Sequence, residues 1–173
     1  MTVSSDPVTL LNGALIDHLS EQARSHTRKR LNLNLHSSYE DPCQRLFIAI
    51  EPSSYVRPHR HLSPLRSETF LAIRGRLILL LFDDNGQLSR SMSLVGGGDP
   101  FGLEIPGGVW HSVFALDEGS VFFETKPGPY QPLSDKDWAP WAPPEDAPRA
   151  AEFLAELRCQ ALQRLEYGFG EKG

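Results

Sequence analysis

Three histidines and one glutamate have the types and spacing of a metal site. His59 and His61 are two residues apart in "YVRPHRH", where Pro58 favours extended backbone, so both imidazoles should point to one face of a strand. Glu68 lies near the start of the next apolar run, and His111 follows the turn-forming "PGG". Imidazole and carboxylate groups suit a divalent metal such as Fe, Zn, Mn or Ni, with a coordination position open to water or substrate.

The glutamate has two interpretations. Glu68 is either a fourth ligand or a partner that accepts a hydrogen bond from a ligating histidine, because six residues separate it from His61. A lone histidine in a β-barrel is more often a core residue bonded to the backbone. An HxH pair with a third histidine after a glycine turn favours a metal site over three such core histidines.

Four further polar residues are expected to bind the substrate. Asn34 and His36 alternate with leucines, so they share one face of a strand, and Gln44 and Arg57 flank the metal residues in sequence. An arginine beside a metal pocket can hold a carboxylate or phosphate through two hydrogen bonds. The set predicts a polar pocket that accepts a small, anionic or sugar-like molecule.

Proton-transfer groups follow in the last apolar strand and just after it. Glu124 and Lys126 share a face of "SVFFETK", and Tyr130 comes next in the chain. Carboxylate, amine and phenol groups can all act as general acids or bases, so we predict catalytic roles for these three residues. Asp135 and Lys136, near the tryptophans, are expected to anchor the chain instead.

The elements that must position these residues are mostly strands. Apolar residues at helical spacing predict a helix over residues 10–26, and from Arg30 the period changes to two. Roughly eight short strands separated by turn signals follow, including an extended piece over residues 55–61 and a hairpin at Asp84–Gly86. We predict an N-terminal helical extension over 1–29, a barrel over 30–127, and a C-terminal part over 128–173. That last part is an ordered proline- and tryptophan-rich strap with a helix starting near Asp146.

Composition narrows the function classes. The chain has 173 residues and a net charge of −5 without a long basic block, which argues against nucleic acid as a partner. It has no apolar run long enough for a membrane span and no signal-peptide pattern. The cysteines, Cys43 and Cys159, are far apart and indicate a reducing compartment, so we expect a cytoplasmic protein.

The two histidine motifs resemble those of the cupin superfamily. "HRH" with the glutamate and Gly75 is similar to the first cupin motif, and "PGGVWH" is similar to the second. The flanking "HSSYEDPCQRLFIAIEPSSYVRPHRH", "FDDNG" and "GPYQPLSDKDWAPWAPPE" resemble the WbuC family of cupin-fold metalloproteins, over residues 30–145. The resemblance implies a double-stranded β-helix, a jelly-roll barrel, and a link to polysaccharide genes. Departures are the longer spacing to Glu68 and Ala115 in place of the usual asparagine.

Three functions are consistent with this sequence. The first is a metalloenzyme on a small polar substrate such as a sugar derivative, by isomerisation or epimerisation, or by dioxygen chemistry if the metal is iron. The second is a binding or regulatory cupin without catalysis, and the third is a metal that only stabilises the barrel. Exposed strand edges in the barrel also predict a homodimer.

Overall fold

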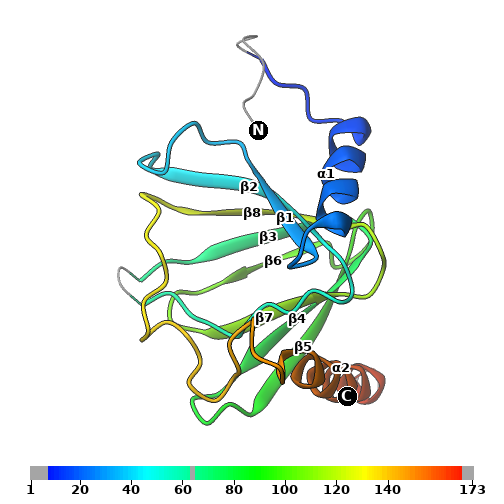
Figure 1. Ribbon diagram of the computed structural model, residues 1–173, viewed down its shortest axis with the longest axis vertical. Helices are drawn as coiled ribbons and strands as arrows, with labels where there is room; N and C mark the ends of the chain where they lie inside the picture. Colours follow the sequence, from blue (N-terminus) through cyan, green and yellow to red (C-terminus); the bar gives the residue numbers. More distant parts are fainter. Residues whose placement is uncertain (1–7, 63–64, 169–173) are drawn as a thin grey trace.

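The computed structural model describes residues 8–62 and 65–168, which form two antiparallel sheets and two helices. In chain order the elements are α1 (Gly13–Ser25), β1 (Arg30–Asn34), β2 (Cys43–Ile50), β3 (Glu68–Arg74), β4 (Arg76–Phe82), β5 (Leu88–Val95), β6 (Gly102–Ile105), β7 (Trp110–Ala115), β8 (Ser120–Pro127) and α2 (Ala150–Gly168). Figure 1 shows the two sheets facing each other, with one helix beside each.

The strand order is that of a jelly roll. The larger sheet has the order β1-β2-β8-β3-β6 and the smaller one β5-β4-β7. The predicted extended piece runs beside the free edge of β7, where His59 and His111 exchange backbone hydrogen bonds of 3.0 and 2.9 Å. It therefore takes the place of a fourth strand in the smaller sheet. This arrangement confirms the predicted fold class, an all-β jelly-roll barrel with one helix before it and one after it in the chain.

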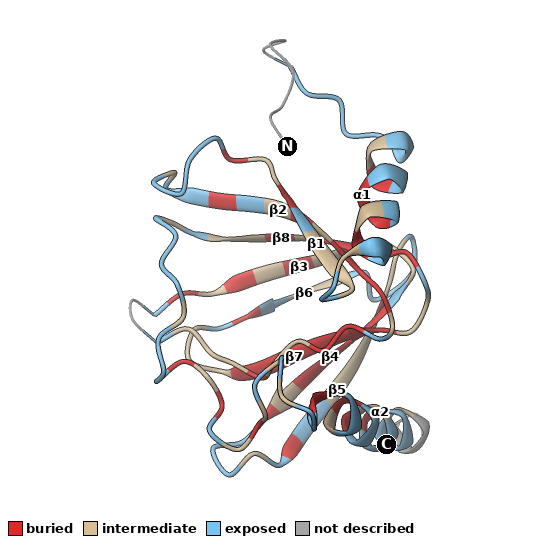
Figure 2. Cartoon of the chain, viewed as in Figure 1, coloured by how far each residue is buried: buried red, intermediate tan, exposed pale blue. Residues whose placement is uncertain are grey.

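Side chains alternate between the two faces of each strand, so apolar clusters form between each sheet and its helix and also between the two sheets. Leu33 and Phe47 on the outer face of the larger sheet pack against Leu19 of α1, while Leu154 and Leu157 of α2 pack against the smaller sheet. Figure 2 shows β7 and much of β4 buried between these layers. The inner faces of the two sheets enclose a further apolar cluster, so each sheet is covered on both sides.

Both helices are shorter than the sequence predicts. α1 begins at Gly13, after the Asn12 side chain accepts a hydrogen bond from the Leu15 amide at 3.0 Å, as an N-cap does. α2 begins at Ala150 and not near Asp146, because residues 144–150 form successive turns before helical bonding starts. The prediction placed both starts too early.

The proline- and tryptophan-rich strap, residues 128–149, is ordered and lies along the barrel (Figure 1). Its Trp141 ring lies against Gly86 of the β4–β5 turn, where a Cβ atom would come within 2.6 Å of the ring. Gly86 also has a φ of +82°, which favours glycine. The hairpin turn predicted around this glycine is thus also a docking point for the strap.

The predicted terminal parts, 1–29 and 128–173, extend into residues 1–7 and 169–173, which lie outside the described residues. Neither α1 nor α2, over its described length, has the length and hydropathy required to cross a bilayer.

Candidate metal centre

Three separate parts of the chain bring the four predicted metal residues together. His59 and His61 come from the extended piece, His111 from β7 and Glu68 from the first position of β3. Their candidate ligand atoms all lie within 4.8 Å of one another. The ring centroid of His111 is 4.4 Å from that of His59 and 5.9 Å from that of His61. The four side chains therefore form one cluster.

The glycine turn before β7 fixes one side of this cluster. A Cβ atom on Gly107 would lie 2.7 Å from the Arg66 backbone nitrogen, and Gly108 has a φ of +82°. The Gly108 amide donates to the His61 carbonyl at 3.0 Å. The "PGG" sequence is required here because the turn packs directly against the chain that carries the other ligand residues.

Strand register places the carboxylate in a row of polar side chains across the larger sheet. Gln44 on β2 pairs with Lys126 on β8, and the β8–β3 register continues this row to Glu68. In the other direction, the β1–β2 register continued by two residues places His36 opposite Gln44. All four side chains line one internal cavity, so the row faces the barrel interior.

Backbone carbonyls orient two of the imidazoles. The Nδ1 atom of His59 lies 2.9 Å from the Arg57 carbonyl, and Nδ1 of His111 lies 2.9 Å from the Val109 carbonyl. A carbonyl only accepts, so each Nδ1 carries the proton and each Nε2 keeps its lone pair. Metal-ligating histidines have this arrangement, with one nitrogen bonded to a backbone or carboxylate group and the other free for the ion.

The cluster fits a divalent cation. Nε2 of His61 and of His111 lie 2.9 and 3.1 Å from the two Glu68 oxygens, yet His61 Nε2, His111 Nε2 and Glu68 Oε2 are buried without a hydrogen-bond partner. Orphaned buried acceptors are costly, and an ion between them would satisfy all three. Two atoms that each lie about 2.1 Å from one ion are at most about 4.2 Å apart, so small side-chain movements suffice.

Lys126 balances the buried acidic groups. Its Nζ atom lies 2.8 Å from Glu68 Oε1 and 2.8 Å from Glu124 Oε1. Burial lowers the pKa of Lys126, but the charges of Glu124 and Glu68 outweigh burial and raise it overall. The ammonium group therefore stays protonated and holds the two carboxylates in place.

The two carboxylates have opposite pKa shifts. Burial raises the pKa of Glu124 above its ordinary value, and the Lys126 charge opposes this only in part. Burial acts on Glu68 in the same direction, but the His111 and His61 rings and the Lys126 charge bring its pKa well below the ordinary value. Burial also lowers the pKa of His59 well below its usual value, which keeps that imidazole neutral and able to ligate.

A cavity of about 340 Å³ adjoins the cluster. It is lined by three of the four predicted metal residues, all three residues predicted to transfer protons, and three of the four residues predicted to bind substrate. These are His59, Glu68 and His111; Glu124, Lys126 and Tyr130; and Asn34, His36 and Gln44. Tyr130 lines the cavity and is 44% exposed, so it lies at the cavity mouth, whereas Glu124 is buried.

Arg57 is not brought to this cavity. Its guanidinium donates to the Ala139 carbonyl at 2.9 Å and lies 5.5 Å from the centroid of the Trp138 ring. Both partners belong to the strap, which the chain sequence alone does not place. In the structure Arg57 therefore contacts the strap, and its substrate contact stays a prediction.

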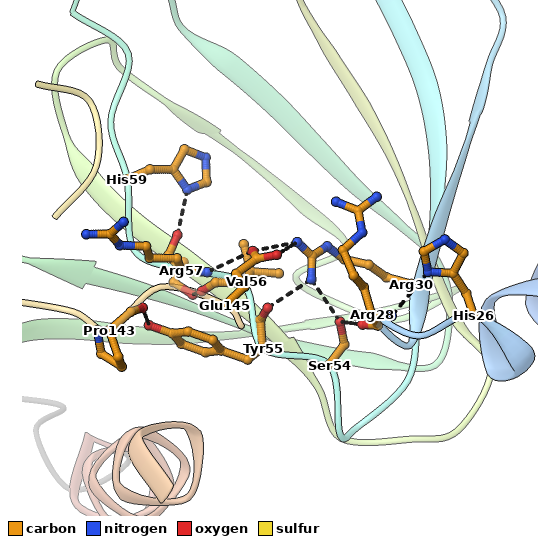
Figure 3. Close-up of polar contacts among 11 residues, drawn as sticks. His26, Arg28, Arg30, Ser54, Tyr55, Val56, Arg57, His59, Pro143 and Glu145 are labelled. Carbon is orange, nitrogen blue, oxygen red and sulfur yellow. Dashed lines mark hydrogen bonds and ion pairs between the residues drawn. The ribbon is translucent and has the colours of Figure 1, made fainter. Parts of the chain in front are cut away.

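The strap also holds the backbone around the metal residues (Figure 3). Glu145 accepts two hydrogen bonds from Arg30, at 2.5 and 2.6 Å, and one from the Arg57 amide at 3.3 Å. Arg30 in turn donates to the Tyr55 carbonyl at 2.8 Å. The carbonyl that orients His59 thus belongs to a residue whose own amide is fixed by this ion pair.

Two anchoring residues were missed in the sequence. The Asp137 carboxylate accepts hydrogen bonds from Ser134 and from the Leu62 amide, next to His61, whereas Asp135 and Lys136 are exposed. Asp137 and Glu145 lie in a segment without period, so no pattern distinguishes them from solvated acids. Tyr39, at the cavity mouth, was also missed, although an aromatic residue within a polar loop is a signal that could have indicated a binding role.

One family model matches part of the sequence. Residues 11–94 match the model of a family described as a domain of unknown function, DUF6016, which is less than half of the chain. No curated protein matches the chain in sequence.

Solved structures with a similar fold include KdgF, a cupin superfamily protein and an oxalate decarboxylase. KdgF from Halomonas sp. is 14% identical with a TM-score of 0.46, over 59% of this chain and 82% of that one. A cupin superfamily protein from Desulfitobacterium hafniense is 15% identical with a TM-score of 0.45, over 63% and 85%. A mutant of Bacillus subtilis oxalate decarboxylase is 19% identical with a TM-score of 0.45, over 59% of this chain and 26% of that one.

Proposed function

We propose that this chain is a metal-dependent enzyme that moves a proton on a small, oxygen-rich molecule, as in isomerisation or epimerisation. One observation carries the proposal: the buried Glu124 and the partly buried Lys126 form an ion pair in the cavity that His59, Glu68 and His111 also line, and Lys126 contacts Glu68. A stabilising metal alone gives no reason to bury a second carboxylate beside a lysine, since burying charges is costly. The motif resemblance to the WbuC family supports a sugar derivative as the substrate.

The residues divide the chemistry among them. His59, His61, Glu68 and His111 would hold a divalent cation, which supplies Lewis acidity to a substrate oxygen. Glu124, as carboxylate, takes a proton from the carbon next to the substrate carbonyl and returns it to the other face or to the neighbouring atom. Lys126 keeps Glu124 and Glu68 in position through both half-steps. No oxidant is consumed, and the proton taken up is the proton returned.

Solvent exchange tests this proposal. The metal-loaded protein is incubated in D2O with D-galacturonate and other hexose derivatives, and deuterium at carbon next to the carbonyl is followed by NMR. We expect exchange with the wild type and its loss in Glu124→Gln, which keeps the size of the side chain but not its basicity. Metal content should be equal in both proteins. A Glu124→Gln protein that exchanges deuterium as fast as the wild type would contradict the assignment.

The same samples distinguish the alternatives. Oxygen uptake without deuterium exchange would favour an iron oxygenase over an isomerase. A compound that raises the melting temperature and stays chemically unchanged would favour a binding protein.

We also propose that the chain forms a homodimer. The outer strands of the larger sheet are β1 and β6, and unpaired strand edges favour pairing with a second chain. Light scattering after size exclusion should give twice the chain mass of 19.3 kDa, whereas a single monomer peak would contradict the dimer.

A further inference from the structure

His36 is the one described histidine that lines the cavity without belonging to the metal cluster. It follows β1 and is only 8% exposed. Its Nδ1 atom lies 3.1 Å from the Arg45 amide nitrogen and 3.0 Å from the Arg45 carbonyl. That carbonyl already accepts from the Leu35 amide at 2.8 Å, so the Arg45 amide is the group that needs Nδ1 as its partner.

This contact fixes the tautomer of His36. A neutral imidazole has one donor and one acceptor nitrogen, so an Nδ1 atom that accepts leaves the proton on Nε2. Nε2 of His36 is buried and has no hydrogen-bond partner. A buried donor without an acceptor is costly, which points to an acceptor that comes from outside the chain. The tautomer is the opposite of that of His59 and His111.

Two tyrosines line the same cavity as this donor. Tyr39, from the β1–β2 connection, and Tyr130, from the start of the strap, have ring centroids 4.9 Å apart and both line the cavity. The Tyr130 amide donates to the Tyr39 carbonyl at 2.7 Å, which joins the two segments at the left of Figure 1. The His36 ring lies 6.1 Å from the Tyr39 ring. Aromatic faces of this kind pack against the C–H edges of a ring-shaped ligand.

The row of side chains across the larger sheet sets the distance between His36 and the metal cluster. His36 and Glu68 are separated by three strand spacings, which is roughly 14 Å along the sheet. A metal–oxygen bond and a hydrogen bond together take about 5 Å of this distance. The remainder, roughly 9 Å, is long enough to hold a six-membered ring with one oxygen-bearing group at each end.

The charge of the cavity favours an anion. Lys126 offsets one of the two carboxylates, and a divalent cation would leave the pocket positive. Arg28 also lines the cavity, and its guanidinium has no acidic partner among the described residues, whereas Arg30 is paired with Glu145.

We infer that His36, Tyr39 and Tyr130 form a second binding subsite, and that the ligand is a ring-containing organic acid of monosaccharide size held at both ends. One end binds at the metal cluster, and an acceptor oxygen at the other end receives the Nε2–H of His36. The inference rests on the proposed function for the metal end only, because the His36 contacts are independent of a metal.

Calorimetric titration tests the subsite with two probes and three variants. The Zn²⁺-loaded wild type is titrated with D-galacturonate, which can span both ends, and with lactate, which can reach only one. We expect His36→Phe to weaken galacturonate binding roughly tenfold, as the loss of one hydrogen bond does, and to leave lactate binding unchanged. His36→Gln, which keeps a donor near the Nε2 position, should retain most of the galacturonate affinity.

His26→Phe is the matched control. His26 also accepts a backbone amide on Nδ1, from Arg28 at 3.2 Å, but it does not line the cavity. His26→Phe should leave the affinities for galacturonate and lactate unchanged. All variants should bind Zn²⁺ as the wild type does and melt cooperatively. Equal galacturonate affinity in wild type and His36→Phe, or no galacturonate binding to the wild type, would overturn the subsite. Failure of the wild type to bind Zn²⁺ would instead overturn the proposed function.

Discussion

The backbone next to each ring decides which nitrogen the described histidines of the cavity present. His59 and His111 each bond the carbonyl two residues earlier in the chain, which frees Nε2 as a lone-pair donor. His36 instead accepts from an amide and presents an N–H group. Histidine thus presents two kinds of group in one cavity, a nitrogen lone pair at one place and a hydrogen-bond donor at another.

Nitrogen chemical shifts test this assignment directly. In metal-free protein at pH 8, long-range 1H–15N correlation spectra should show the Nδ1–H tautomer for His59 and His111 and the Nε2–H tautomer for His36, because their backbone partners differ. His26→Phe should leave these signals in place. Finding the same tautomer at all three positions would contradict the hydrogen bonds described here.

Local sequence signals explain why the cluster of His59, His61, Glu68 and His111 was predictable and some of its partners were not. His59 and His61 share a face because a strand has a period of two, and "PGG" before His111 is a turn in any context. Arg57 and the missed Glu145 meet only because the strap returns across the barrel. No spacing along the chain encodes that return.

At the scale of elements, the extended piece that carries two candidate ligand residues, His59 and His61, is held from both sides. On one side it bonds β7, and on the other the Arg60 amide donates to the Asp137 carbonyl and the Ala139 amide to the Pro58 carbonyl. The strap therefore acts as a neighbouring strand for a segment that has no regular ladder of its own. Metal binding and the fold of the strap should be coupled for this reason.

Glu145→Gln tests the coupling between the strap and the ligand segment. Removing one charge of the partly buried Arg30–Glu145 pair should lower the free energy of unfolding by about 1–2 kcal/mol and weaken metal binding measurably, because the Arg57 amide loses its carboxylate partner. Urea unfolding and Zn²⁺ titration measure the two effects. Asp117→Asn, which removes the exposed Arg76–Asp117 pair, should change neither. Equal effects of the two substitutions would contradict the role of the strap.

Asp137→Asn should destabilise the protein in a pH-dependent way. Burial raises the pKa of Asp137, but its hydrogen bonds from Ser134 and Leu62 outweigh burial and lower it below the ordinary value. A lowered folded-state pKa means that the stabilisation is complete above the unfolded pKa of about 3.9 and is lost as the pH falls through the folded-state value. The difference in unfolding free energy between wild type and variant should therefore be largest at pH 7 and shrink below about pH 4. A difference that grows on acidification would contradict this.

The period of the apolar residues alone predicts the strands, but it fails where the chain forms irregular turns. The alternation over residues 31–36 and the apolar run 77–82 correspond to β1 and β4. The start of α2 was predicted too early because Pro148 fits the first turn of a helix as well as it fits the turns that precede Ala150.

At the scale of the whole molecule, two sheets enclose a cavity because their inner faces are not uniformly apolar. Ile50 and Phe70 fill one part of the interior, whereas the row His36, Gln44, Lys126 and Glu68 keeps another part polar. The fold class was predictable because strand count, turns and motifs agree. The size of the cavity depends on side chains from five or more elements and was not.

Metal binding should stabilise the whole molecule. An ion at about 100 times its dissociation constant adds about 2.7 kcal/mol, which for a chain of this size corresponds to a rise in melting temperature of roughly 5–10 °C. Differential scanning fluorimetry of chelator-treated protein with and without added Zn²⁺, Mn²⁺, Ni²⁺ or Fe²⁺ measures it. No shift with any of these ions would contradict a metal role at this site.

Metal stoichiometry tests the central claim most directly. Chelator-treated wild type, His111→Ala and the control His26→Ala are dialysed against Zn²⁺ and their bound metal is measured by mass spectrometry. We predict one ion per chain in the wild type and in His26→Ala, and an affinity lower by on the order of 10²-fold or more in His111→Ala, because one of four converging ligands is lost. Equal metal binding by all three proteins would contradict the assignment of His59, His61, Glu68 and His111 as a metal centre.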